Sequence, residues 1–261
     1  MKTQAINHVK MRLKSLLGAI LDLILPPKCL KCSQRVDSAH NICPECWKNI
    51  TFITDPKCFI CGLPFDIETN NEKILFNESL CGVCEKGGRS FDRAVSALRY
   101  DDESRKMIIS YKHQDRTEYA KYFAKLLEQA GKELFDNVDI IIPVPLHRNR
   151  LITRRFNQSA LVSHALAREL CVEHKPQLLL RTKNTPPQQG NSNKRSINVK
   201  GAFNISPKDA SQIKDTNILL IDDVYTTGAT AENCAKTLKR NGAKAVYVLT
   251  IYRALQPQST I

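Results

Sequence analysis

The stretch that decides the fold spans residues 218–230 and reads ILLIDDVYTTGAT. Four apolar residues, typical of a buried strand, run into the adjacent carboxylates of Asp222 and Asp223, and a loop of small and hydroxyl side chains follows. Such a loop before a helix presents backbone N–H groups and a favourable helix dipole to phosphate. The carboxylates would repel phosphate, so we expect them to accept hydrogen bonds from sugar hydroxyls. The pattern therefore predicts a ribose 5-phosphate site, with the loop residues Thr226, Thr227, Gly228, Ala229 and Thr230 on the phosphate.

The sequence on both sides of this stretch alternates between strand and helix patterns. This alternation predicts an α/β domain at residues 91–261 with a largely parallel sheet, whose ligands bind beyond the carboxyl ends of the strands. Residues 182–200 read as a polar loop. The expected strands are 93–99, 138–144, 178–180, 217–222 and 245–252, and the expected helices are 104–111, 117–135, 157–170 and 228–241.

Eight of the ten cysteines form four Cys-x-x-Cys pairs between residues 29 and 84. Each pair can present two thiolates to one metal, and two pairs complete the tetrahedral four-sulfur site of structural zinc. A disulfide framework suits a secreted chain, and the close cysteine run of ferredoxins is missing. We therefore predict two structural zinc sites. Their ligands are Cys29, Cys32, Cys43, Cys46, Cys58, Cys61, Cys81 and Cys84.

The order in which these pairs combine is open at this level. Pairing of neighbours along the chain closes each half locally and is favoured, whereas interleaved pairing would give a cross-brace. Either way the sequence predicts a double zinc ribbon at residues 28–90, in which metal contributes on the order of 10 kcal/mol per site. Cys171 and Cys234 lie outside the pattern, and we expect both to be buried apolar positions.

The N-terminal segment 1–27 carries apolar residues at helical spacing, which predicts an amphipathic helix. We expect its apolar face to pack on the protein in preference to a membrane surface. Asp22 interrupts the apolar stretch, which is shorter than the roughly 20 residues of a spanning helix. The segment also lacks the small residues of a signal-peptide cleavage site. We therefore expect no stable membrane insertion and a cytoplasmic location.

The charge of the chain is concentrated in one segment. The 261 residues contain 39 basic and 26 acidic side chains, a net charge of +13. Residues 147–201 alone hold 11 basic and 2 acidic groups, or +9, whereas residues 61–146 carry −3. A positive field localised in this way attracts polyanions such as nucleic acid or a phosphorylated small molecule.

The order of these features resembles that of the ComF family of competence proteins, which join a double zinc ribbon to a type I phosphoribosyltransferase domain. Residues 218–230 resemble the motif with which such transferases bind phosphoribosyl pyrophosphate (PRPP). Outside the motif and the four cysteine pairs, the similar stretches are 24–29, 100–112, 143–147, 156–158 and 195–203.

The resemblance implies roles for further residues. By the resemblance, Asp222 and Asp223 would be the catalytic and PRPP-binding acids. Magnesium would bridge pyrophosphate and ribose oxygens. The turn of Leu146, His147 and Arg148 would contact pyrophosphate. The loop 182–200 would form a hood over the site, and its polar residues include Gln188, Gln189 and Arg195. The chain departs from the family pattern once, where Arg155 replaces a glycine.

Two classes of function follow. The chain is either an enzyme that transfers phosphoribosyl groups to a nucleobase or nucleotide, or a nucleic-acid-associated factor that uses the PRPP fold as a binding module. The resemblance implies DNA uptake during transformation, with single-stranded DNA and competence or DNA-processing proteins as partners. Phe156 could stack on a base, although a phenylalanine at a helix start is more often in the core. The expected DNA contacts are Arg148, Arg150, Arg154, Arg155, Lys194 and Arg195.

Overall fold

A computed structural model describes residues 26–65, 78–113, 116–183 and 201–255. The chain divides into two compact units, Met1–Asn49 and Ile50–Ile261. The predicted N-terminal helix and the predicted hood, with Gln188, Gln189, Lys194 and Arg195, lie outside the described residues. Among the residues that are described, no helix combines the length and the apolar character that a bilayer span requires.

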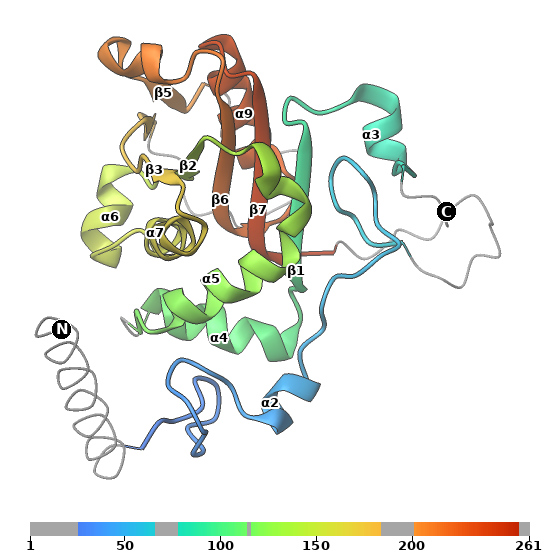
Figure 1. Ribbon diagram of the computed structural model, residues 1–261, viewed down its shortest axis with the longest axis vertical. Coiled ribbons are helices and arrows are strands. Elements are labelled where there is room, and N and C mark those ends of the chain that lie inside the picture. The colour runs from blue at the N-terminus through green and yellow to red at the C-terminus, as the bar shows by residue number, and fades with distance from the viewer. Residues whose placement is uncertain (1–25, 66–77, 114–115, 184–200, 256–261) are drawn as a thin grey trace, which may run out of the picture. The chain divides into compact units, whose positions relative to one another are not determined.

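A five-stranded, wholly parallel sheet forms the centre of the second unit, in the order β1-β7-β6-β2-β3 (Figure 1). This confirms the predicted α/β fold with a parallel sheet. The central strands are apolar along most of their length because helices cover both faces of the sheet. The strands are β1 (Arg93–Arg99), β2 (Ile140–Pro143), β3 (Glu173–His174), β6 (Asn217–Tyr225) and β7 (Ala245–Arg253).

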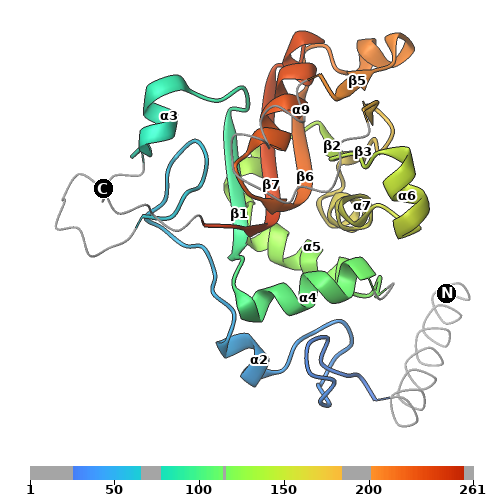
Figure 2. The ribbon, with the colours of Figure 1, turned by 180° about the vertical axis from the view of Figure 1, so that it is seen from behind.

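Helices pack on opposite faces of this sheet (Figures 1 and 2). On one face, α5 (Tyr119–Ala130) and α7 (Gln158–Leu170) contact each other and the strands, beside α4 (Asp102–His113). On the other face lies α9 (Ala229–Arg240), which begins directly after the β6 loop. The shorter helices are α2 (Pro44–Lys48), α3 (Gly82–Gly87), α6 (Arg148–Arg154) and the 3-10 segments Lys132–Asn137 and Pro207–Gln212.

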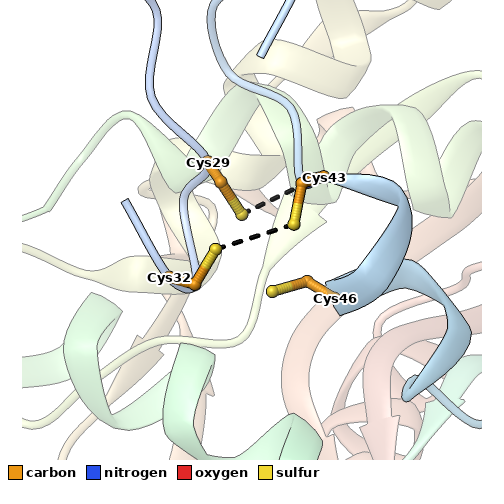
Figure 3. A group of neighbouring side chains, drawn as sticks. All are labelled: Cys29, Cys32, Cys43 and Cys46. Atoms are coloured by element: carbon orange, nitrogen blue, oxygen red, sulfur yellow. Dashed lines mark hydrogen bonds between the residues drawn. The ribbon is translucent and has the colours of Figure 1, made fainter. Parts of the chain in front are cut away.

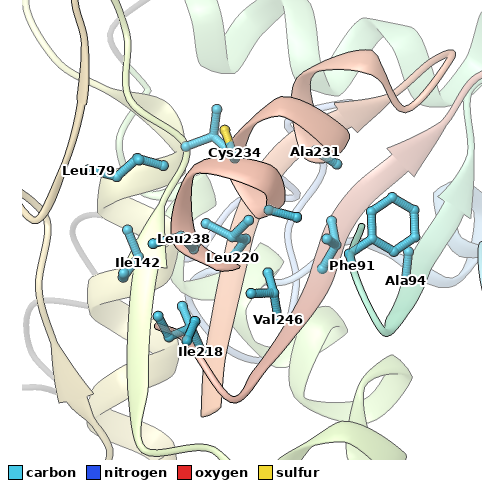
Figure 4. Packing of buried hydrophobic residues seen from close by; sticks show 14 of the residues in the cluster. Phe91, Ala94, Ile142, Leu179, Ile218, Leu220, Ala231, Cys234, Leu238 and Val246 are labelled. Carbon is cyan, nitrogen blue, oxygen red and sulfur yellow. The ribbon is translucent and has the colours of Figure 1, made fainter. Parts of the chain in front are cut away.

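The core beneath α9 fixes the place where the β6 loop begins. Cys234 and Leu238 of α9 are fully buried and face Leu220 of β6 and Val246 of β7 (Figure 4). The prediction of a buried, apolar Cys234 is therefore confirmed. Because interiors are closely packed, the helix start cannot shift without disturbing this layer.

The outer edge of β1 is covered by residues that lie before and within the third cysteine pair. The Arg99 N–H donates to Thr51 O at 2.8 Å, and the Ala94 N–H donates to Ile60 O at 2.7 Å. At Gly62, whose φ is +68°, an added Cβ would lie 2.6 Å from Ala94 O. A side chain there would separate the ribbon from the sheet, so glycine is required. The covered edge also blocks pairing with other chains.

Several predicted elements differ from the observed ones. The helix expected at 117–135 ends at Ala130, because Gly131 packs against Leu249 and leads into a 3-10 turn. The strand expected at 178–180 is β4 (Leu179–Arg181), and it pairs antiparallel with β5 (Phe203–Ile205) outside the main sheet. Cys171 is exposed in a left-handed conformation at the end of α7, so the expectation that it is buried was wrong.

Candidate functional site

The acidic pair lies where β6 extends beyond its neighbour β2. Pro143 of β2 pairs with Ile221 of β6, and β2 ends there. On the other side, β6 continues to pair with β7 through Asp222 and Tyr225. The strand is therefore three residues longer than predicted, and the carboxylates lie within it. One neighbour strand has already ended, which opens the β2 side of the strand to a ligand.

A small polar network holds the two carboxylates. Asp222 Oδ1 accepts the Asp223 N–H at 2.8 Å and the Ser159 hydroxyl at 3.3 Å. Asp223 forms an ion pair with Lys112 at the end of α4, and each of these two side chains is 18% exposed. The acids are thus fixed by residues of two helices. Burial and the neighbouring charge of Asp223 raise the pKa of Asp222 to about 7.

This pKa shift predicts a pH-dependent stability for the Asp222→Asn variant. An unfolded aspartate titrates near about 3.9, so between about pH 4 and pH 7 the folded protein keeps a proton that the unfolded chain loses. The group therefore lowers stability progressively as the pH rises to 7. We expect Asp222→Asn to raise the free energy of unfolding by about 1–3 kcal/mol at pH 8 and by little at pH 4.5. Urea denaturation at both pH values measures this, and an equal effect at both would contradict it.

The loop after Asp223 has a tightly constrained shape. Gly228 adopts φ +79°, and an added Cβ would lie 2.2 Å from the Tyr225 hydroxyl oxygen. The Ala229 N–H faces Thr227 Oγ1 at 3.4 Å as α9 begins. Thr226, Thr227 and Thr230 are partly buried. Thr226, Thr227 and Gly228 thus form a bend between a rigid strand and a twelve-residue helix, and Ala229 and Thr230 begin that helix.

The turn predicted to contact pyrophosphate follows β2 directly. The Val144 N–H donates to Ile221 O at 2.8 Å, which places this part of the chain beside Asp222. The Asn157 side-chain amide holds it by donating to Val144 O at 3.0 Å. His147 then caps α6 by accepting the Asn149 N–H at 3.2 Å, and Arg148 is exposed. The predicted pyrophosphate turn therefore leaves the sheet next to Asp222. It consists of Leu146, His147 and Arg148.

Sequence reasoning missed three side chains of this site. Lys112 pairs with Asp223, Ser159 donates to Asp222, and Arg181 of β4 interacts with Asp222 electrostatically. Lys112 is the last residue of the stretch 100–112, which resembles the family, and this resemblance was the only sequence feature that pointed to Lys112. Ser159 and Arg181 carried none, because both reach the acids from distant parts of the chain.

The basic segment brings like charges together on α6 and β4. Burial and the positive charges of Arg181 and Arg154 lower the pKa of Arg150. Such crowding favours an anionic ligand. Phe156 packs near Tyr111, with ring centroids 6.2 Å apart, so it joins the aromatic core as the second reading of the sequence allowed. Arg155 ends α6 with φ +62°, a backbone conformation that the family's glycine adopts without strain.

A groove of about 620 Å³ runs along α9 on the far side of the loop. Thr227 and Ala229 border it, and Arg89, Lys236 and Arg240 line it. It forms a second cationic surface next to the loop. Arg181 packs on Phe203 of the groove and so adjoins it to the Arg150 cluster, which consists of Arg150, Arg154 and Arg181.

The first cysteine cluster, Cys29, Cys32, Cys43 and Cys46, brings its four sulfur atoms within 4.8 Å of one another (Figure 3). Sulfur atoms at the corners of a tetrahedral zinc site with bonds of about 2.3 Å lie about 3.8 Å apart. The sulfurs of Cys32 and Cys43 are 3.6 Å apart, which fits that geometry.

The second cysteine cluster, Cys58, Cys61, Cys81 and Cys84, repeats the first. The sulfurs of Cys61 and Cys81 are also 3.6 Å apart. In each cluster the second pair starts a short helix, and a backbone N–H of that pair faces the first cysteine's sulfur. Pairing of neighbours along the chain is therefore confirmed, and both clusters fit structural zinc.

We expect two zinc ions per purified chain. Cys43→Ser and Cys81→Ser should each reduce the count to about one, because each removes one of four thiolates from a separate site. Metal analysis of both variants measures this, with exposed Cys171→Ser as the control that keeps two zincs. Full zinc content in both variants would show that these cysteines are not ligands.

Comparison with known proteins gives relatives that match almost end to end. Residues 20–85 match the double zinc ribbon domain family. The DNA utilization protein YhgH of Escherichia coli is 30% identical over 89% of this chain and 100% of its own length. Competence protein F of Haemophilus influenzae is 29% identical over 87% of this chain and 97% of its own.

The chain belongs to the ComF family of competence proteins. Another relative of this ComF protein, competence protein ComFC of Bacillus subtilis, is 25% identical over 82% of the chain and 85% of its own length. The solved structures that it resembles are distant. A hypoxanthine phosphoribosyltransferase from Staphylococcus aureus gives a TM-score of 0.34 at 12% identity, over 54% of this chain and 76% of its own. The parallel sheet with its flanking helices and the two cysteine clusters confirm the predicted phosphoribosyltransferase-like fold with a double zinc ribbon.

Proposed function

We propose that this ComF protein binds PRPP with Mg²⁺ at Asp222–Thr230 and acts in DNA uptake and natural transformation by binding single-stranded DNA. One observation carries the ligand assignment: an acidic pair and a constrained loop stand five residues apart at the end of one buried strand. A ribose 5-phosphate carries the two groups that these parts would bind, a diol for the carboxylates and a phosphate for the loop. The names of the relatives, competence protein and DNA utilization protein, support the proposed process.

Each part of the site has a chemical task in this proposal. The carboxylates of Asp222 and Asp223 accept hydrogen bonds from the ribose hydroxyls, and the loop offers N–H groups to the 5′-phosphate. Arg148 reaches the pyrophosphate. Carboxylate oxygens are also ligands that Mg²⁺ prefers, and the ion would reduce the repulsion between acid and pyrophosphate when bound. Lys112 balances the negative charge of Asp223.

The alternative function is an active phosphoribosyltransferase of nucleotide metabolism. The intact acidic pair favours it, because such transfer requires positioning and charge stabilisation and no covalent nucleophile. Release of pyrophosphate from PRPP, screened against nucleobases and single-stranded DNA, decides between the two. Turnover with a base and no affinity for DNA would replace the proposed role by the metabolic one.

The proposed DNA contacts start from the Arg150 cluster and the basic segment around it. Phosphate contacts release counterions, so we expect steep weakening with salt, by about 0.7 of a log unit per log unit of salt for each contact on a single strand. Fluorescence anisotropy of a labelled oligonucleotide at two salt concentrations, with and without PRPP, tests this. We expect partial competition by PRPP, because Arg148 would serve both ligands, and we place this activity in the cytoplasm.

Charge reversal localises the DNA surface. Arg150→Glu with Arg154→Glu is expected to remove most of the salt-dependent affinity. Lys236→Glu with Arg240→Glu in the groove along α9 makes the same change of net charge on the other cationic surface. If the α6 variant binds DNA like the wild type, or if affinity is flat with salt, the basic segment is no DNA site and the metabolic role is preferred.

A further inference from the structure

Arg253 connects the second cysteine cluster to the last residue of β6, directly before the phosphate loop. It is the last residue of β7, is only 5% exposed, and pairs in register with Tyr225 of β6. Its guanidinium donates to Cys61 O at 2.6 Å and to Cys61 Sγ at 3.7 Å. The same group lies 4.4 Å from the centre of the Tyr225 ring. One side chain thus contacts an expected zinc ligand and the residue directly before the loop.

Tyr225 in turn lies against the loop. Its hydroxyl oxygen occupies the space where a Cβ on Gly228 would be, at 2.2 Å. Phe91 holds the ring from another side, edge-on, with centroids 6.4 Å apart. A displaced Tyr225 ring would therefore either press on the loop or leave it without support. Only Arg253 and Tyr225 separate Cys61 from Gly228.

A second connection joins the chain after this cluster to the first turn of α9. The Ser90 N–H donates to Glu232 Oε2 at 3.0 Å, and the Ser90 hydroxyl donates to Glu232 Oε1 at 2.7 Å. Ser90 follows Cys84 by six residues, and Glu232 follows Gly228 by four. Arg89, directly before Ser90 in the chain, interacts electrostatically with both Cys84 and Tyr225. The loop is thus held at both of its ends by contacts to the ribbon.

Zinc supplies the rigidity on which these contacts depend. The four cysteines of this cluster join the apolar core of the second unit, and bound zinc would fix their sulfurs relative to one another. A site of one Zn²⁺ and four thiolates carries a net charge of −2, which the guanidinium groups of Arg253 and Arg89 balance. Without the metal, Arg253 loses a fixed acceptor in Cys61, and Tyr225 loses the group that packs on its ring.

We propose that the second zinc site positions the phosphate loop through Arg253 and Tyr225, so that zinc at this site sets the affinity for the ribose phosphate, whereas zinc at the first site does not. The ligand in this proposal rests on the proposed function. Arg253 and Tyr225 are positioning residues and do not touch the ligand. The first cysteine cluster belongs to the other compact unit and provides the matched comparison.

The experiment compares the affinity for PRPP with Mg²⁺, by equilibrium dialysis, in full-length variants of known zinc content. Cys81→Ser, which lacks the second zinc, is expected to bind at least tenfold more weakly, whereas Cys43→Ser, which lacks the first, stays within twofold of the wild type. Arg253→Met should weaken binding about tenfold while it retains both zinc ions, and Arg253→Lys should recover part of the loss. Arg105→Met, which removes an exposed arginine of α4 in the same unit, is the control.

Hydrogen exchange of the backbone at residues 225–232 gives a readout that needs no ligand. Faster exchange in Cys81→Ser and Arg253→Met, but not in Cys43→Ser, supports the proposal. Equal exchange and equal affinity in Arg253→Met and the wild type would overturn it, even if Cys81→Ser fails to fold. If the wild type binds no PRPP, the proposed function fails, and the exchange comparison still tests the link between zinc and loop.

Discussion

Replacing both Asp222 and Asp223 with Asn is expected to lower the affinity for PRPP with Mg²⁺ at least 100-fold. The diol loses two charge-assisted acceptors, each worth about 1.5–3 kcal/mol, and Lys112 loses the carboxylate that balances it. Asn keeps the size of the side chain, so β6 and its pairing with β7 should persist. Equilibrium dialysis with radiolabelled PRPP measures the loss.

Asp136→Asn is the matched control, because Asp136 is an exposed acid outside the site. It changes the net charge in the same direction and should leave the affinity unaltered. If the double variant is folded and still binds like the wild type, the carboxylates do not contact the ligand, and the assignment of the acidic pair fails.

Gly228→Ala is expected to weaken the affinity for PRPP strongly by distorting the loop that would bind its phosphate. The new Cβ would meet the Tyr225 hydroxyl at 2.2 Å, and φ +79° is unfavourable for any residue with a side chain. We expect a stability loss of about 2 kcal/mol and an affinity loss of more than about 30-fold, because the N–H groups no longer converge. Urea denaturation and dialysis measure the two effects separately.

Gly87→Ala provides the comparison for this change. Gly87 ends α3, has no positive φ, and would accept a Cβ with no atom within 4 Å. Its variant should match the wild type in both stability and affinity. Wild-type affinity in Gly228→Ala would show that the loop does not need its observed shape to bind the ligand.

The sequence was sufficient for features whose determinants lie close together in the chain. Each zinc site is built from two Cys-x-x-Cys pairs, so spacing alone indicated the ligands, and local closure favoured the observed pairing. The phosphate loop could be read because its buried strand, small residues and helix start are consecutive. The parallel sheet followed from the alternation of apolar strands and helices.

Contacts between distant parts of the chain could not be read in this way. Ser159 meets Asp222 across 63 positions, and Arg253 meets Cys61 across 192. No periodicity or motif encodes such pairs, because they depend on how the sheet is ordered. The seven-residue helix α6 and the short strand β5 were missed for a related reason, since segments of that length carry little periodic signal.

The central claim is that the strand end at Asp222–Thr230 binds PRPP. Equilibrium dialysis of the wild-type protein, loaded with two zinc ions, against radiolabelled PRPP and Mg²⁺ tests it most directly. We predict one PRPP bound per chain, displaced by unlabelled PRPP and lost in the Asp222→Asn, Asp223→Asn variant. A folded, zinc-loaded protein that binds no PRPP at millimolar concentration would contradict the claim.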